Sequence, residues 1–295
     1  MVNNRLIATA SDEPVDARGG GLGAFILGLA QNVVVAGNTA VGSSGLETGS
    51  AGGDALGGGV MVTSDNNNSS LDGITIGNNQ AIAGQGGDGQ PDGEARSGGI
   101  FTTAGHSVIA ASSIFFGNIE VAADGTVTPN DCINGRADRF LSLGFNVVGA
   151  PADTCDFEAS TDLVGVDPEF YALADYGCAT PLPDGSCVPT LAIDQTSPAA
   201  DAGRCLTADF IMEDSRNLPR PFDLPAVDNN AGDGCDSGAF EAIDVDGDGF
   251  TEAADCDPLN PDVNAADRCG VCGGDGTSCV LFEDGFESGD TTAWN

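Results

Sequence analysis

The chain has 295 residues, and its 45 acidic residues against 9 basic residues give a formal net charge of −36. All of the basic residues are arginine, which excludes a lysine nucleophile or Schiff base. The negative charge opposes binding to nucleic acid, anionic membrane surfaces and polyanionic sugars.

The composition favours a turn-rich β protein of an oxidising compartment. The 44 glycines and the scarcity of aromatic residues predict many tight turns, and the 41% apolar fraction is enough for a core. The 10 cysteines all follow residue 131, and their even number favours disulfides. The alternative is a reduced cytosolic chain with metal-binding thiolates. We expect the protein to lie outside the cell or on a bacterial outer surface.

The first residues do not resemble a signal peptide. The apolar run from Leu6 to Ala10 is too short for a signal-peptide core. No apolar run approaches the ~18 residues of a membrane helix. Because the chain otherwise looks secreted, we expect it to be an N-terminally truncated product or the tail of a longer chain.

Residues 1–130 contain a repeat. Gly-Asn pairs recur with a period of 40, at Gly37-Asn38, Gly77-Asn78 and Gly117-Asn118. Between them a second unit recurs as Gly57-Gly-Gly59-Val60 and Gly98-Gly99-Ile100, and Gly19-Gly-Gly21-Leu22 matches it two residues out of phase. A fixed period in this range indicates stacked repeat units that bury their faces against each other.

Each unit has short strands with alternating apolar residues, ended by Gly or Asn. Two strands per repeat predict an all-β fold, a right-handed parallel β-helix with coils of about 20 residues. We expect Asn38, Asn78 and Asn118 to stack at one corner, and residues 41–56 and 82–97 to protrude as solvated loops. The alternative is an antiparallel sandwich.

Residues 131–242 have a different pattern. It includes Ser142-Leu-Gly144-Phe-Asn146, Ser197-Pro198-Ala-Ala-Asp201, Arg220-Pro221 and Cys235-Asp236-Ser-Gly238-Ala-Phe240-Glu241. The series closely resembles the choice-of-anchor Q domain of bacterial surface and secreted proteins, and residues 19–120 resemble polymorphic outer-membrane-protein repeats. The resemblance implies a surface-displayed β-helix ending. We interpret the charges of Asp201, Arg220 and Asp236 as a structural cluster.

Proximity along the chain suggests three disulfides, Cys132–Cys155, Cys178–Cys187 and Cys205–Cys235. Each would constrain the unfolded chain by about 2–4 kcal/mol. The remaining cysteines, Cys256, Cys269, Cys272 and Cys279, allow three pairings. Disulfides are favoured here because a zinc ribbon needs a second Cys-x-x-Cys and a redox pair needs a strand-to-helix turn.

Residues 244–255 are a nearly complete calcium loop. Oxygen side chains occupy positions 1, 3, 5, 9 and 12, as Asp244, Asp246, Asp248, Glu252 and Asp255. Gly249 permits the sharp turn, and the carbonyl of Phe250 would be a backbone ligand. Asp255 departs from the usual bidentate Glu. We expect Ca²⁺ bound structurally, because a β segment precedes the loop and Asn-Pro turns follow it. The alternative is an acidic surface turn.

Residues 243–280 therefore form a calcium-binding, cysteine-rich segment that resembles a single thrombospondin type 3 unit. A second ion near Asp257, Asn260 and Asp262 is left open. Residues 281–295 include Asp284-Gly-Phe-Glu-Ser-Gly-Asp290, which resembles the endings of some secreted Gram-negative proteins. A sorting tag and a disordered terminus are both consistent with it.

We expect a non-enzymatic protein of adhesion or surface display, with cell-surface or matrix partners that include neutral glycans. The alternative is a carbohydrate-active β-helix enzyme. A lyase of acidic sugars is disfavoured by the charge, and a hydrolase needs carboxylates ~5–9.5 Å apart, for which residues 19–120 show no cluster. His106 is the single histidine, and no Ser or Cys motif around it indicates a nucleophilic triad. A third interpretation is a stalk for another domain.

Overall fold

The computed structural model describes residues 1–9, 13–24, 28–46, 49–63, 68–103, 107–134, 140–149, 157–205, 212–258, 260 and 262–274. Over these residues the chain is all-β, with strands and turns and no helix. The chain divides into two compact units, Met1–Ala242 and Ile243–Asn295.

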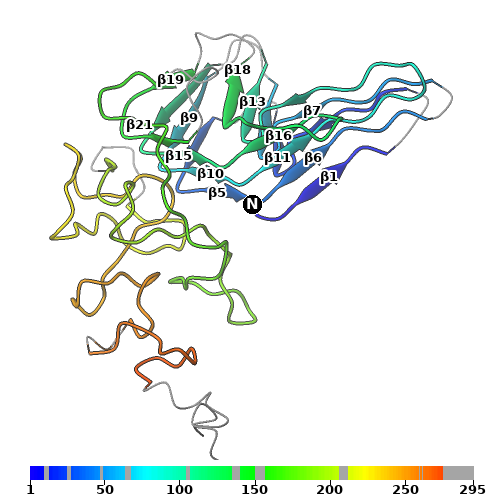
Figure 1. The fold of residues 1–295 in the computed structure, drawn as a ribbon. Helices are drawn as coiled ribbons and strands as arrows, with labels where there is room; N and C mark the ends of the chain where they lie inside the picture. Colours follow the sequence, from blue (N-terminus) through cyan, green and yellow to red (C-terminus); the bar gives the residue numbers. More distant parts are fainter. Residues whose placement is uncertain are drawn as a thin grey trace, which may run out of the picture. The chain divides into compact units, whose positions relative to one another are not determined.

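The strands of the first unit form five sheets (Figure 1). The β1 sheet contains, in order, β1 (Arg5–Ile7), β6 (Thr39–Val41), β11 (Gln80–Ile82), β16 (Ile119–Val121) and β17 (Val127–Pro129). The β5 sheet contains β5 (Val34–Ala36), β10 (Thr75–Gly77), β15 (Ile114–Phe116), β20 (Val147–Val148) and β21 (Leu163–Val164).

The other three sheets follow the same principle. The β2 sheet contains β2 (Ala17–Arg18), β7 (Ala55–Leu56) and β12 (Ala95–Arg96). The β3 sheet contains β3 (Leu22–Ala24), β8 (Val60–Val62), β13 (Ile100–Thr102) and β18 (Cys132–Asn134). The β4 sheet contains β4 (Leu29–Gln31), β9 (Asn68–Asp72), β14 (Ser107–Ala111) and β19 (Phe140–Ser142).

The chain passes through the sheets in one order, β5, β1, β2, β3 and β4; among the described residues the first pass has no strand in the β5 sheet and the last has none in the β2 sheet. We call these passes coil 1 (residues 1–31), coil 2 (34–72), coil 3 (75–111) and coil 4 (114–142). Neighbouring coils pair in parallel and in register, so that Val34 lies opposite Thr75 and Thr75 opposite Ile114. A complete coil, such as coil 2 or coil 3, therefore takes a whole repeat and has five short strands. The sequence predicted two strands per 40-residue unit, in a coil of about 20 residues plus protruding loops, and that number of strands was wrong.

Parallel pairing also argues against the antiparallel sandwich, because β16 with β17 is the one antiparallel pair among the described strands. The second recurring unit is confirmed in its register, since Leu22, Val60 and Ile100 lie opposite one another in the β3 sheet.

The main core lies among the β5, β3 and β4 sheets, because alternate residues of a strand point to the same face. Its members are Val35, Ile76, Phe115 and Val148 from the β5 sheet, Val60, Val62, Ile100 and Cys132 from the β3 sheet, and Leu71, Val108, Ala110 and Phe140 from the β4 sheet. Phe157 completes it, and the rings of Phe115, Phe140 and Phe157 lie 5.3–5.7 Å apart between centroids.

The stacked asparagines differ from the predicted set by one residue. Gly37, Asn78 and Gly117 share the corner position with positive φ, which Gly and Asn tolerate. The residues that follow them, Asn38, Asn79 and Asn118, are buried and hydrogen-bonded to one another. Asn38 and Asn79 are 41 residues apart, and Asn79 and Asn118 are 39 apart. The strict period of 40 in the sequence therefore selected Asn78, one residue before the asparagine that stacks.

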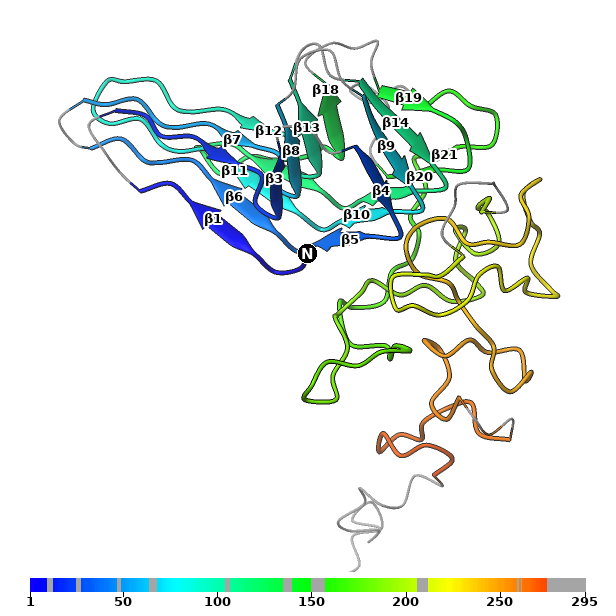
Figure 2. The same ribbon diagram turned by 180° about the vertical axis from the view of Figure 1, so that it is seen from behind.

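The segments predicted to be solvated loops form a hydrogen-bonded arm (Figure 2). Gly53 N donates to Ser43 O at 2.8 Å, Gly84 N to Gly53 O at 3.0 Å, and Gly93 N to Gly84 O at 2.9 Å. A Cβ atom at Gly53 would collide with the carbonyl of Val15. Glycine is required there because the backbones approach closely. The segments protrude as predicted, and residues 88–92 are exposed, whereas most described residues of 41–56 are buried or half-buried.

The described residues of 166–242 are rich in turns, and some of their backbone N–H groups donate hydrogen bonds to the coils. Gly238 N donates to Ser112 O at 2.7 Å, and Ala239 N donates to the Thr75 hydroxyl at 2.9 Å. The predicted disulfides Cys178–Cys187 and Cys205–Cys235 are both present. Cys132 is also disulfide-bonded, but the predicted partner Cys155 lies outside the described residues.

In the second unit, the described residues between 243 and 274 form turns and bends, with one isolated β-bridge between Ala266 and Cys272. The disulfide Cys256–Cys272 selects one of the three pairings that the sequence left open. Cys269 is disulfide-bonded as well, and Cys279 and the predicted tail 281–295 lie outside the described residues.

Candidate metal centre

Residues 244–249 fold as a tight turn around the carboxylate of Asp244. Gly247 N donates to Asp244 Oδ1 at 2.7 Å, and Gly249 N donates to Asp244 Oδ2 at 2.9 Å. Gly247 and Gly249 have φ values of +80° and +94°, a region that L side chains seldom adopt. The two glycines therefore let the chain turn back toward the first carboxylate.

The turn brings three predicted ligands together. One carboxylate oxygen from each of Asp244, Asp246 and Asp248 lies within 4.8 Å of the others, a grouping that could hold a metal ion. The Oδ1 atoms of Asp246 and Asp248 accept from the backbone N–H groups of Asp248 and Phe250, at 3.3 and 2.8 Å. Their Oδ2 atoms are buried and accept no hydrogen bond.

The two buried Oδ2 atoms of Asp246 and Asp248 indicate whether a cation fits this cluster. Burying a carboxylate oxygen without a donor or a cation is unfavourable. A cation beside the three oxygens would remove that penalty. The donor set is oxygen only, which suits hard cations such as Ca²⁺ and Mg²⁺. Asp244, Asp246 and Asp248 are therefore the residues that would hold it.

The remaining predicted ligands are not part of this cluster. Glu252 Oε2 accepts from Ile243 N at 2.9 Å, and Glu252 N donates to Ile243 O at 3.0 Å, so this side chain closes the base of the loop. Asp255 Oδ1 accepts from Asp257 N at 2.9 Å. Phe250 follows the cluster directly, and its side chain is exposed. Whether its carbonyl is a ligand stays a prediction.

The pKa of Asp246 is consistent with several carboxylates lying close together. The pKa of Asp246 is raised, first by desolvation and then by the carboxylates of Asp248, Asp255 and Asp244. Asp255 is therefore close enough to act on Asp246 electrostatically, although its oxygens lie outside the cluster of three.

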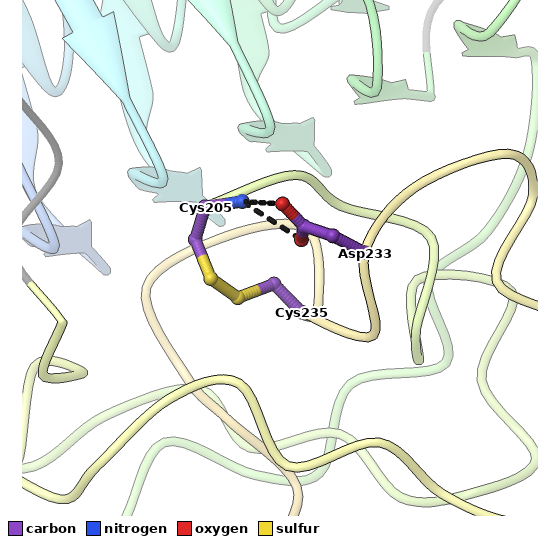
Figure 3. Close-up of side chains that lie close together, drawn as sticks. All are labelled: Cys205, Asp233 and Cys235. Atoms are coloured by element: carbon purple, nitrogen blue, oxygen red, sulfur yellow. Dashed lines mark hydrogen bonds between the residues drawn. A yellow bond between two sulfur atoms is a disulfide. The ribbon is translucent and has the colours of Figure 1, made fainter. Parts of the chain in front are cut away.

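A second grouping of metal-ligand types, Cys205, Asp233 and Cys235, has a different explanation. The two sulfur atoms are joined in a disulfide, and the Asp233 carboxylate accepts from Cys205 N at 3.0 Å (Figure 3). Metal ligation by cysteine requires thiolates, which a disulfide does not provide. The arrangement is a disulfide-braced turn.

Besides Asp131, six charged side chains are buried among the described residues of the first unit. They are Asp201, Asp214, Asp236, Glu241, Arg216 and Arg220. Arg220 Nε lies 3.0 Å from Glu241 Oε2, and Arg216 Nη2 lies 2.7 Å from Asp214 Oδ2. Arg216 also packs over the ring of Phe240 at 3.7 Å.

The acids of this cluster bind backbone groups. Asp236 Oδ1 accepts from Asp201 N at 2.8 Å, Asp201 Oδ2 accepts from Leu224 N at 3.0 Å, and Glu241 Oε1 accepts from Phe222 N at 2.6 Å. Burial raises the pKa of Asp201 to about 7, with contributions from Asp223 and Glu241. Burial, followed by Glu241, raises the pKa of Asp236 well above its usual range. Because the partners are backbone groups of neighbouring loops, we interpret this cluster as structural.

A hollow of about 270 Å³ contains two acids that the sequence did not single out, Glu94 and Glu120. Glu94 forms an ion pair with Arg96. Glu120 Oε1 accepts from Ser97 N at 2.6 Å and from Asn130 Nδ2 at 2.8 Å. Burial raises the pKa of Glu120. These acids are 26 residues apart in the sequence, so no local motif could have linked them.

His106 lies outside the described residues. Across the described ranges, no helix is long and apolar enough to span a membrane. Comparison of the chain with protein-family models, curated proteins and solved structures finds no match.

Proposed function

We propose that the protein is an extracellular structural protein in which a right-handed parallel β-helix is followed by a calcium-ordered, disulfide-linked segment. The parallel coils, their common core and the recurring register support the β-helix. The disulfides are compatible with an extracellular location. The resemblance to choice-of-anchor Q domains adds the proposal that the protein is displayed on a bacterial surface.

The calcium proposal depends on one observation, the buried Oδ2 atoms of Asp246 and Asp248 that accept no hydrogen bond beside Asp244. Ca²⁺ accepts flexible coordination by six to eight oxygens, whereas Mg²⁺ requires a near-octahedral shell and retains water. The loop spacing and glycines favour Ca²⁺. Phe250 and Asp255 are proposed to complete the shell.

The role of the ion is structural. A divalent cation would offset the repulsion among Asp244, Asp246 and Asp248 and would hold the turn in one conformation. The protein's own contribution is to orient the carboxylates through Gly247, Gly249 and the Glu252–Ile243 contacts. Extracellular modules of this type bind Ca²⁺ at about 10⁻⁴–10⁻³ M.

The test is a titration of the full chain after metal removal with a chelator. Ca²⁺ should raise the resistance of residues 243–274 to proteolysis, with a midpoint of about 10⁻⁴–10⁻³ M. Mg²⁺ at equal concentration should have a smaller effect. If neither proteolysis nor isothermal titration calorimetry responds to Ca²⁺, the metal proposal is wrong.

Adhesion or display is proposed because the first unit has an extended repeat architecture and the charge disfavours polyanionic ligands. Cell-surface or matrix components, including neutral glycans, are the proposed partners. Protease treatment of intact cells that produce the protein should remove it from their surface. Complete protection in intact cells, with cleavage after lysis, would contradict surface display.

A second candidate function is hydrolysis of a neutral glycan. It is favoured by the hollow that Glu120 shares with Glu94, where burial raises the pKa of Glu120, because hydrolysis of a glycosidic bond uses a pair of carboxyl groups. The Arg96, Ser97 and Asn130 contacts weigh against it, since they engage both carboxylates. Release of reducing sugar that Glu120→Gln abolishes would favour hydrolysis. No release from a panel of neutral glycans would favour the structural protein.

A further inference from the structure

Coil 4 leaves one strand position vacant in the β2 sheet. Coils 1, 2 and 3 contribute β2, β7 and β12 to this sheet, whereas the described part of coil 4 contributes none. Instead, β17 folds back and pairs with β16 in the β1 sheet. Ala95 of β12 lines the hollow of about 270 Å³ together with Thr126 and Thr128 of the β17 hairpin. This hollow therefore lies where a fourth strand would pair with β12.

The edge of β12 beside the hollow has free backbone groups. In the stacked coils, Ala17 N donates to Asp54 O at 2.8 Å, and Ala55 N donates to Glu94 O at 2.8 Å. Ala95 lies opposite Ala55 and is the next residue in this series. Successive residues of a parallel strand bond alternately to its two neighbours, so the N–H and C=O of Ala95 face the vacant position. Among the described residues, none accepts from Ala95 N or donates to Ala95 O.

A row of acids ends at the same edge. Asp16 Oδ1 accepts from Asp54 N at 3.1 Å, and Asp54 Oδ1 accepts from Glu94 N at 2.8 Å. In each step, a carboxylate of one coil binds the N–H of the equivalent residue in the next coil. The carboxylate of Glu94 is exposed and paired with Arg96, and no described residue of coil 4 brings an N–H to it. An added strand would supply that N–H, and it would also bond to Ala95.

Two residues beside the hollow depart from the repeat, and the first is Glu120. It lies opposite Ala81, which lies opposite Ala40, so a carboxylate replaces the small side chain that faces the β2 sheet in the other coils. Its Oε1 accepts from Ser97 N at 2.6 Å and from Asn130 Nδ2 at 2.8 Å. Among the described residues, no donor reaches its Oε2. This half-buried carboxylate is therefore only partly satisfied.

The second departure is Ser97, which occupies a corner that is glycine in the two preceding coils. The φ values of Gly19, Gly57 and Ser97 are +73°, +65° and +54°, a region that L side chains seldom adopt. Ser97 is fully buried, and its hydroxyl has no hydrogen-bond partner among the described residues. A buried polar group without a partner is unfavourable. The residue next to Glu120 thus carries a hydroxyl that a ligand would satisfy.

We propose that the vacant position beside β12 binds an extended basic peptide of a partner protein. Backbone hydrogen bonds to Ala95 align the peptide with the sheet, and one Lys or Arg side chain of the peptide binds Glu120 and Ser97. A Lys ammonium carries three donors, so it serves both the carboxylate and the hydroxyl. In strand addition to a sheet edge, backbone bonds give affinity and the sites for alternate side chains give specificity.

The charge of the site selects a basic peptide. A neutral strand would bury the Glu120 carboxylate without a counterion, which is unfavourable. An acidic strand would meet Glu94, Glu120 and the net charge of −36, and the same charge attracts cationic segments. The cation belongs on the residue opposite Ala95, because side chains at that position face the β1 sheet in the other coils.

The probe is the peptide acetyl-Val-Thr-Lys-Thr-Val-amide, and the matched control peptide has norleucine in place of Lys. Binding to the full chain is followed by calorimetry and by amide hydrogen exchange. The Lys peptide should bind about tenfold more tightly than the norleucine peptide and should slow exchange of the Ala95 N–H. Equal binding of the two peptides, or no binding of either, would overturn the proposal.

Four variants locate the site. Glu120→Gln keeps an acceptor for Ser97 N and should lower affinity for the Lys peptide about tenfold. Ser97→Gly restores the corner glycine and should also weaken binding. Ala95→Pro removes the free N–H and leaves the pairing with β7, so it should abolish binding. Asp88→Asn removes an exposed carboxylate elsewhere in the first unit and should bind as the wild type does.

Full binding by Ala95→Pro would show adsorption to the acidic surface and would overturn the proposal. An Ala95 N–H that is already protected in the free chain would also overturn it, because another segment or a second copy would then hold the position. No predicted metal ligand lines the hollow, so chelation of Ca²⁺ should leave peptide binding unchanged. Failure of the peptide assay therefore leaves the calcium proposal intact.

Discussion

The side-chain amide of Asn118 donates to the carboxylate of Asp131 at 2.8 Å, and the same Asn118 accepts from Asn79 Nδ2 at 2.8 Å. The side-chain amides of Asn38, Asn79 and Asn118, which we call the asparagine ladder, each bind backbone groups of the preceding coil and donate to the side-chain oxygen of the next member or of Asp131. Asn79, for example, also donates to Val35 O at 2.9 Å. Substitution of a ladder residue should therefore leave several buried polar groups without partners.

Asn79→Ala should destabilise the first unit by about 2–4 kcal/mol, since each buried polar group left unsatisfied costs about 1–3 kcal/mol. The matched control is the adjacent Asn78→Gly, because Asn78 is exposed and its positive φ suits glycine. Urea unfolding should show a change of less than about 0.5 kcal/mol for the control. A larger loss at Asn78 than at Asn79 would contradict the observed register.

Asp246→Asn should weaken Ca²⁺ binding at least tenfold, or about 1.4 kcal/mol. The substitution removes a charge and a ligand oxygen while preserving the side-chain shape. Asp88→Asn is the control, because it removes one exposed carboxylate in the first unit. Calorimetric titration of both full-length variants compares them, and equal affinity would show that net charge alone governs binding.

Because of Asp201, the free energy of unfolding should fall as pH rises from about 4 to about 7. Its pKa in the folded protein, about 7, lies above the usual 3.8, so the folded state holds the proton that the unfolded state releases in this window. The stabilisation is complete below the unfolded pKa and is lost as pH rises through the folded pKa. One proton corresponds to about 1.4 kcal/mol per pH unit.

The comparison is with Asp201→Asn, which keeps an acceptor for Leu224 N and cannot ionise. Urea unfolding at fixed calcium, measured across this pH range, should show the variant gaining relative stability as pH rises. Parallel curves for the two proteins would mean that Asp201 does not titrate in this window.

Removal of the Cys205–Cys235 disulfide should cost more stability than removal of Cys178–Cys187. The sequence separations are 30 and 9 residues, and chain entropy gives roughly 3.6 and 2.6 kcal/mol for these loops. Cys205 and Cys235 are also fully buried. Paired alanine substitutions, followed by denaturant unfolding, test the order. The reverse order would show that the longer loop is already constrained in the unfolded chain.

The local chemistry was readable from the sequence. The repeat, the parallel all-β class, two disulfides and the grouping of Asp244, Asp246 and Asp248 follow from residue types at short or fixed spacings. In each case the interacting residues are close along the chain or occupy equivalent positions of a repeat. Gly247 and Gly249 likewise indicated the turn that brings the carboxylates together.

The tertiary structure decided which residues meet across coils. Asn79 rather than Asn78 enters the ladder, because Asn78 takes the corner position that glycine occupies in the neighbouring coils. The glycine-rich arm, the buried Arg220–Glu241 pair and the hollow with Glu94 and Glu120 also join distant segments. Sequence alone set the period and the chemistry of each coil. A one-residue shift in register would turn every side chain of a strand to the opposite face of the sheet. The register was therefore fixed only when the coils packed around a common core.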